Sequence, residues 1–173
     1  RKGLPVTCEL MPHHFSLTEE AVRGFNTAAK MRPPLRTETD TKALKQGLKN
    51  GLIQAIATDH APHASHEKET PFSCAANGLV GLETALPVSL KVVEEGILSL
   101  PQLIKLLTIG PARVLGLPKG SLEVGATADI VIFDPNKKIQ IDAAKFKSKS
   151  KNTPFDDWKL KGCVQTTIVS GQV

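Results

Sequence analysis

Residues 52–63 read LIQAIATDHAPH, and this stretch decides most of what the chain can be. Its apolar first half predicts a buried strand, so the carboxylate of Asp59 and the imidazoles of His60 and His63 emerge together where a strand ends and a loop begins. In a barrel of parallel strands, the C-terminal strand ends carry the chemistry. Pro62 fixes one φ angle in this turn and so restricts the direction of the two histidines.

The carboxylate of Asp59 has two interpretations. In one, it ligates a metal ion or takes a proton from a metal-bound water. In the other, it caps an ordinary loop and the neighbouring histidines are solvated. The stretch alone does not decide between them, so the choice depends on what the rest of the chain brings to the same place.

The composition is that of a soluble globular protein, with 40% hydrophobic and 23% charged residues in a chain of 173. No apolar run approaches the ~20 residues that a membrane span needs, and no signal peptide is visible. Three cysteines without CxxC spacing fit reduced thiols and a cytoplasmic location better than a disulfide framework or a structural zinc site. Because no initiator Met is present, we expect the sequence to begin within a longer protein.

The formal net charge is +5, and part of it comes from a lysine-serine stretch at residues 145–151. Alternating lysines can form an anion or nucleic-acid patch. No aromatic stacking platform accompanies them here, so we interpret the stretch as a solvated loop and expect no nucleic-acid partner.

The first two thirds of the chain alternate strand and helix patterns, which predicts α/β architecture with a parallel sheet. The expected strands are Val6–Leu10 and Leu52–Thr58. The expected helices are Ser16–Ala29, Thr39 or Thr41 to Asn50, Gly78–Val93 with a kink or boundary at Pro87, Ser99–Leu107 with Ser99 as cap, and Pro111–Leu115.

After Pro118 the sequence becomes rich in turns and short strand patterns, at residues 128–134, 137–141, 158–161 and 166–169. The first of these is expected to end in a Pro-Asn turn. We therefore predict two domains: an α/β region over residues 1–118 and an all-β segment over residues 119–173.

Five motifs in one order carry a resemblance. They are PPLR (33–36), TDHAPH (58–63), NGLVGLET (77–84), GSLEVGATAD (120–129) and KNTPF (151–155). Taken together, they resemble the C-terminal half of a dihydroorotase of the cyclic amidohydrolase superfamily. The resemblance implies the C-terminal portion of a TIM-like (β/α)8 metal-dependent hydrolase barrel, followed by part of a small β-sandwich.

The resemblance also implies an activity and a set of roles. The activity is zinc-dependent, reversible cyclisation of N-carbamoyl-L-aspartate to L-dihydroorotate in pyrimidine biosynthesis. Asp59 matches the aspartate that ligates zinc and shuttles a proton. His63 matches the residue that holds the substrate carboxylate, and Arg32 lies at a substrate-binding position. Asn77 and Gly78 match the place where backbone groups line the substrate.

The remaining histidines are not assigned to the metal. His13 and His14 follow a strand end, but in the family the zinc histidines lie earlier, so we interpret this pair as structural. His60 is interpreted as a neighbour that orients Asp59 or the loop. Because the other ligands of one or two zinc ions would lie upstream of Arg1, the isolated chain is expected to be inactive and to bind zinc weakly, if at all.

Two alternatives stay open. A dihydropyrimidinase, hydantoinase or allantoinase would share the barrel and the metal aspartate, but need not hold a substrate carboxylate as His63 and Arg32 would. The chain could instead belong to an inactive dihydroorotase-like subunit that stabilises aspartate transcarbamoylase. Retention of Asp59 favours an active enzyme with a small-molecule substrate, either as a homodimer or together with aspartate transcarbamoylase.

Overall fold

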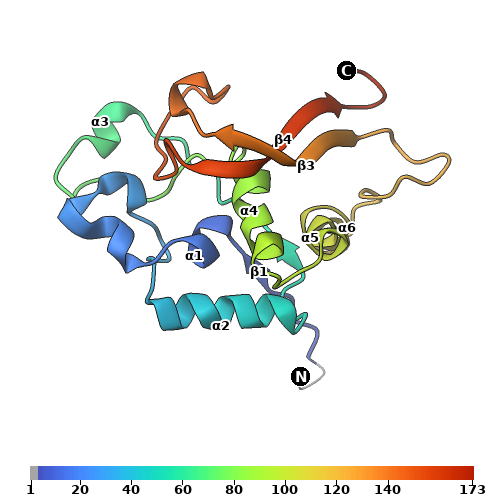
Figure 1. The fold of residues 1–173 in the computed structure, drawn as a ribbon, viewed down its shortest axis with the longest axis horizontal. Helices are drawn as coiled ribbons and strands as arrows, with labels where there is room; N and C mark the ends of the chain where they lie inside the picture. Colours follow the sequence, from blue (N-terminus) through green and yellow to red (C-terminus); the bar gives the residue numbers. More distant parts are fainter. Residues whose placement is uncertain (1–3) are drawn as a thin grey trace.

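The computed structural model describes residues 4–173 as an α/β fold with two separate two-stranded sheets (Figure 1). The strands are β1 (Glu9–Leu10), β2 (Ala55–Ile56), β3 (Ile130–Gln140) and β4 (Lys159–Ile168). The α-helices are α1 (Pro12–Ser16), α2 (Glu38–Lys49), α3 (Ser65–Lys68), α4 (Ala85–Glu94), α5 (Leu100–Leu107) and α6 (Ile109–Val114). Short 3-10 helices are η1 (Glu19–Phe25), η2 (Thr27–Ala29) and η3 (Ala143–Lys145).

The parallel pair β1–β2 confirms the predicted α/β alternation. Glu9 lies opposite Ala55 and Leu10 opposite Ile56, so both strands are shorter than the apolar runs that predicted them. Both residues of β2 are buried, as expected for a strand covered on both faces. This pair accounts for two parallel strands of the predicted barrel.

Helix α2 begins at Glu38, one residue before Thr39 and three before Thr41, the two predicted starts. Thr37, rather than Thr39 or Thr41, is the N-cap: its hydroxyl accepts the Asp40 backbone N–H at 3.2 Å, and the Asp40 carboxylate accepts the Thr37 N–H at 3.2 Å. This reciprocal capping box satisfies two N–H groups that the first turn leaves without helical partners. Gly51, with φ +64°, ends the segment as predicted.

The helix predicted over Ser16–Ala29 is wrong. Ser16 is the last residue of α1, and the following residues form η1 and η2. Arg23 has ψ 142° and Gly24 has φ +69°, so the helical path is broken there. The Asn26 side chain then accepts the Ala28 N–H at 3.1 Å, which begins a new turn.

Helix α4 begins at Ala85 instead of Gly78 because Leu79 pairs with another segment and residues 82–84 form a turn. His60 and Leu79 form a parallel bridge, which commits that segment to sheet-like pairing. Pro87 lies in the first turn of α4, where its missing N–H breaks no helical hydrogen bond. Helix α5 begins after Ser99 as predicted; the Gln102 side chain accepts the Ser99 N–H at 2.7 Å.

The four short strands predicted after residue 118 are two long antiparallel strands with bulges. The predicted Pro-Asn turn lies inside β3, where the register shifts between Asp134 and Lys138. Strand β4 packs against α4: a Cβ added at Gly162 would overlap the side chain of Leu90. Gly162 (φ +104°) therefore permits both the backbone conformation and the close approach of sheet to helix.

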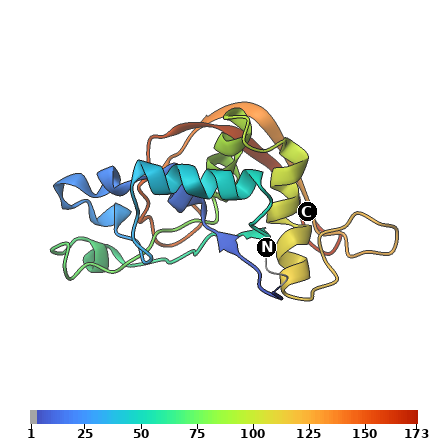
Figure 2. The same ribbon diagram turned by 90° about the horizontal axis from the view of Figure 1, so that it is seen from below.

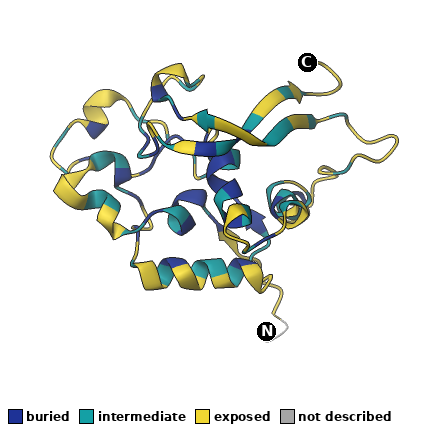
Figure 3. Ribbon diagram, viewed as in Figure 1, coloured by how far each residue is buried: buried dark blue, intermediate teal, exposed yellow. Residues whose placement is uncertain are grey.

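The core lies between α2 and the β3–β4 sheet, around α1 and α4 (Figure 3). One buried cluster joins residues of the first part of the chain to residues after 118, including Val88, Ile141, Phe155 and Leu160. A second cluster packs β1, β2 and α5 together, with Phe15 and Leu103 fully buried. The two-domain division near residue 118 stays a prediction.

Residues 115–129 form an exposed loop that extends away from α5 and α6 in both ribbon views (Figure 2). In the part of the chain that the structure describes, no helix combines the length and apolarity needed to cross a membrane.

Candidate functional site

Asp59 lies three residues beyond β2, exposed, with φ +50°. An aspartate tolerates this left-handed conformation better than most residues, yet it still costs on the order of 1 kcal/mol. Within residues 4–173 its carboxylate forms no hydrogen bond and no ion pair. A strained carboxylate without a protein partner is suited to bind something other than protein.

His60 holds the start of the loop that follows. Its Nδ1 accepts the Gly81 N–H at 3.1 Å, which leaves the proton of the neutral ring on Nε2. The next residue, Ala61, donates its N–H to the Leu79 carbonyl at 2.8 Å. The two ends of segment 60–78 therefore lie side by side, and we call this segment the site loop.

His63 is fixed inside the site loop by its ring nitrogens. Nε2–H donates to the Asn77 carbonyl at 2.9 Å, and Nδ1 lies 3.7 Å from the Glu67 carboxylate. The same carboxylate accepts the Ala64 N–H at 2.8 Å, and this bond is the main reason that the pKa of Glu67 is lowered. The side chain of His63 is 23% exposed.

Gly78 brings the two arms of the site loop into contact. A Cβ added there would lie 2.6 Å from the Ala61 Cβ, and its φ is +109°. Its N–H donates to the Lys30 carbonyl at 2.8 Å, which places the Lys30–Arg32 segment beside it. The side chain of Asn77 is exposed, and this residue contacts His63 through its backbone carbonyl.

Arg32 is exposed, and within the described residues its guanidinium pairs with no carboxylate. The cis Arg32–Pro33 peptide is held by His14, whose Nε2–H donates to the Pro33 carbonyl at 2.9 Å. His13 is 2% exposed, and burial, with a smaller contribution from His14, lowers its pKa to about 3. These contacts fit the structural interpretation of the two histidines.

Three polar residues of the site were missed by sequence reasoning. Lys68 is buried and donates to the Ala76 and Gly78 carbonyls at 2.8 and 3.0 Å, and desolvation lowers its pKa. Glu83 accepts backbone N–H groups of the lysine-serine stretch, and Asn152 bonds to the site loop. Both lie in the motifs NGLVGLET and KNTPF, but neither motif indicates which distant segment the side chain contacts.

A metal ion would find one suitable ligand here. Asp59 offers a free carboxylate, whereas among residues 4–173 no group of three or more His, Cys, Asp or Glu side chains is arranged to hold a metal. His13, His14 and His60 make the other contacts described above. The residues present could therefore supply one ligand of a zinc site and not the complete set.

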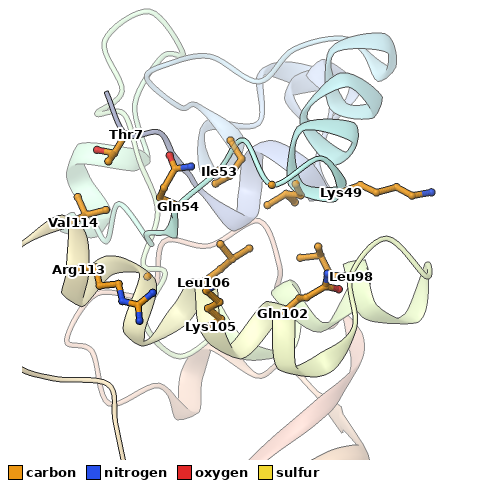
Figure 4. Close-up of a pocket in the computed structure, with 13 residues that line it drawn as sticks. Thr7, Lys49, Ile53, Gln54, Leu98, Gln102, Lys105, Leu106, Arg113 and Val114 are labelled. Carbon is orange, nitrogen blue, oxygen red and sulfur yellow. The ribbon is translucent and has the colours of Figure 1, made fainter. Parts of the chain in front are cut away.

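Two hollows border these elements. One, of about 440 Å³, is lined by residues at the start of β2 on one side and by α5 and α6 on the other (Figure 4). It includes Gln54, which precedes β2, whereas Asp59 follows β2, so it lies at the opposite strand end from the site. The other, of about 400 Å³, lies between α3 and residues 149–152 and includes His63, Lys68 and Asn152.

Comparison with known proteins agrees with the motifs. The dihydroorotase of Geobacter sp. (strain M21) is 57% identical over 172 residues, which are 99% of this chain and 40% of that protein. The dihydroorotase of Acetivibrio thermocellus is 51% identical over 174 residues and 41% of its length. The chain thus spans about 40% of the length of these curated relatives.

Among solved structures, the L-hydantoinase (dihydropyrimidinase) from Arthrobacter aurescens superposes with a TM-score of 0.93 at 35% identity, over 99% of this chain and 40% of that one. The dihydropyrimidinase from Brevibacillus agri NCHU1002 gives 0.91 at 26% identity, over 99% and 39%. The amidohydrolase family model matches residues 5–173. With this match over nearly the whole chain, the protein belongs to the amidohydrolase family.

Proposed function

We propose that this chain is part of a dihydroorotase that reversibly cyclises N-carbamoyl-L-aspartate to L-dihydroorotate. The observation that carries the proposal is 57% identity over 99% of the chain to a protein of that name. The hydantoinases share the fold at 25–35% identity, a weaker likeness than that to the dihydroorotases. A dihydropyrimidinase-type activity is therefore the second candidate.

In the proposed reaction, Asp59 would be a zinc ligand and would move a proton between the attacking water and the ring nitrogen. Its exposed, unpaired carboxylate at the strand end supports this role. Zinc would supply a coordinated water whose pKa is lowered to about 7 and would polarise the carbonyl under attack. The remaining ligands would come from residues outside this chain, so we expect the isolated chain to be inactive and to bind zinc weakly.

Substrate recognition would come from the site loop and from Arg32. A carboxylate substrate group needs hydrogen-bond donors, and the His63 ring lies beside the Asn77–Gly78 backbone, where its Nε2–H donates to the Asn77 carbonyl. The exposed Arg32 guanidinium can bind a carboxylate through two parallel hydrogen bonds. Both residues distinguish an acidic substrate from the neutral rings that a hydantoinase accepts. We propose a cytoplasmic enzyme, acting as a homodimer or together with aspartate transcarbamoylase.

The test is the reaction of the full-length protein with N-carbamoyl-L-aspartate and, separately, with a hydantoin. We expect turnover of the first, and Asp59→Asn to lower kcat by roughly 100- to 10,000-fold, since a proton-transfer group is lost. Metal analysis of both proteins separates loss of zinc from loss of the proton carrier. A full-length protein that binds the substrate but never turns it over would support the inactive-subunit alternative instead.

His63→Ala tests the substrate assignment. Loss of a hydrogen bond to a charged group should raise KM for carbamoyl-aspartate by roughly 10- to 100-fold, with a smaller effect on kcat. The matched control is His66→Ala, in the same loop but exposed and outside the hydrogen bonds of His63. An unchanged KM in His63→Ala would count against the acidic substrate.

A further inference from the structure

The lysine-serine stretch is anchored at both ends. We call residues 146–152 the strap. At one end, the Glu83 carboxylate accepts the Lys147 N–H at 2.8 and 2.9 Å and the Ser148 N–H at 3.1 Å. At the other end, Asn152 bonds to the site loop. The lysine side chains are exposed, as a solvated loop predicts, but the backbone that carries them is held.

Asn152 connects both arms of the site loop through one side chain. Its Oδ1 accepts the backbone N–H of His63 at 3.1 Å. Its Nδ2 donates to the carbonyls of Ala61 at 3.0 Å and Gly78 at 3.2 Å. Its own backbone carbonyl accepts the Val80 N–H at 2.8 Å. An amide suits this position because it donates and accepts at once.

These hydrogen bonds involve His63 and Gly78, two of the residues that would contact the substrate. Without the Asn152 amide, the backbone N–H of His63 and the carbonyl of Ala61 lose their partner, while the Gly78 carbonyl keeps the bond from Lys68. The position of the His63 ring relative to the Asn77–Gly78 backbone would then be less well defined. Displacements near 1 Å at a binding site are enough to weaken binding and catalysis strongly.

We propose that Asn152 is a positioning residue for substrate binding, holding His63 and the Gly78 backbone at the spacing that a substrate carboxylate requires. The proposal rests on the function proposed above for His63. The strap would then contribute to substrate recognition, although it lies far from Asp59 in the sequence. Asn152 itself need not touch the substrate.

The first test is Asn152→Ala in the full-length enzyme. We expect KM for carbamoyl-aspartate to rise about 10-fold, with kcat changed less than about 3-fold, because the substrate contact and not the proton carrier is displaced. Asn136→Ala is the matched control, an exposed asparagine of β3 whose backbone N–H donates to the Asp134 carboxylate. A KM within twofold of the wild-type value would overturn the proposal.

A double-mutant cycle separates positioning from a general structural role. If Asn152 acts through His63, adding Asn152→Ala to His63→Ala should change KM by less than about twofold. If KM in the double variant rises by the product of the two single-variant factors, Asn152 acts elsewhere. If Asn152→Ala fails to fold, the nearly isosteric Asn152→Asp replaces it. That variant keeps the acceptor for the His63 N–H and loses both donors, so KM should again rise.

Hydrogen exchange gives a readout that does not depend on activity. Amides of residues 61–80 should exchange faster in Asn152→Ala than in Asn136→Ala at equal thermal midpoints. If the wild-type enzyme does not cyclise carbamoyl-aspartate, the proposed function fails, and this measurement still decides whether Asn152 orders the loop. Unchanged exchange in the site loop would refute the positioning role.

Discussion

A single buried imidazole makes this protein sensitive to acid. The pKa of His13 is about 3 in the fold because of burial and, secondarily, His14, compared with 6.5 as its ordinary value. Between these values the unfolded chain binds a proton that the folded chain does not. The contribution of His13 to stability is therefore complete above pH 6.5 and falls as the pH drops through this window, by up to about 1.4 kcal/mol per pH unit.

We expect the midpoint of urea unfolding of the full-length protein to fall between pH 7 and pH 5, and His13→Gln to reduce this fall. The control is His66→Gln, which changes an exposed histidine and should leave the pH dependence unaltered. Parallel pH profiles for the wild-type protein and His13→Gln would contradict the assignment.

The site residues differ in how far the sequence could predict them. Asp59, His63 and Gly78 belong to motifs, and the structure brings His63 and Gly78 into one hydrogen-bond network. Asn152 also belongs to a motif, KNTPF, but it lies 89 residues from His63, and nothing in the motif indicates a bond between the two. Polar contacts between distant segments depend on tertiary packing, which no local pattern encodes.

Among the elements, capping patterns located some helix starts and misplaced others. Helix α5 begins after Ser99 as predicted, since Gln102 completes its capping box. Ser16 and Glu19 have the same spacing, but Ser16 ends α1, and Gly24 takes φ +69° and divides the residues that follow. Packing of the short turns η1 and η2 outweighs the local preference for a continuous helix.

Thr37→Ala tests the cap of α2. Removing the hydroxyl leaves the Asp40 N–H without its side-chain partner and should lower the free energy of unfolding by about 1 kcal/mol. Thr39→Ala is the control, an exposed threonine in the first turn of the same helix. Equal effects of the two substitutions on denaturation of the full-length protein would mean that Thr37 does not cap.

For the whole molecule, the docking of the β3–β4 sheet on α4 depends on Gly162. Gly162→Ala adds both an unfavourable positive φ and an overlap with the buried Leu90, and should cost about 2–4 kcal/mol. Gly125→Ala isolates the first effect, since Gly125 has φ +91° and open space around its Cβ. Thermal denaturation of the full-length variants measures how much more stability Gly162→Ala loses than Gly125→Ala.

The double variant Gly162→Ala/Leu90→Ala should lose less free energy of unfolding than the two single variants lose together. The new methyl group occupies part of the space that Leu90 vacates. Strict additivity would mean that the sheet and the helix do not pack as the structure shows.

The bond between Asn152 and His63 also sets an order of events during synthesis. His63 leaves the ribosome 89 residues before Asn152, an interval of roughly 4–18 s at ordinary translation rates. Throughout that interval the loop after β2 lacks the amide that joins its arms, and closing so distant a contact is intrinsically slow. The nascent chain can therefore form β1, β2 and α2 well before the loop that follows β2 is complete. A polypeptide released before residue 152 would carry Asp59 and a site loop that lacks the Asn152 amide.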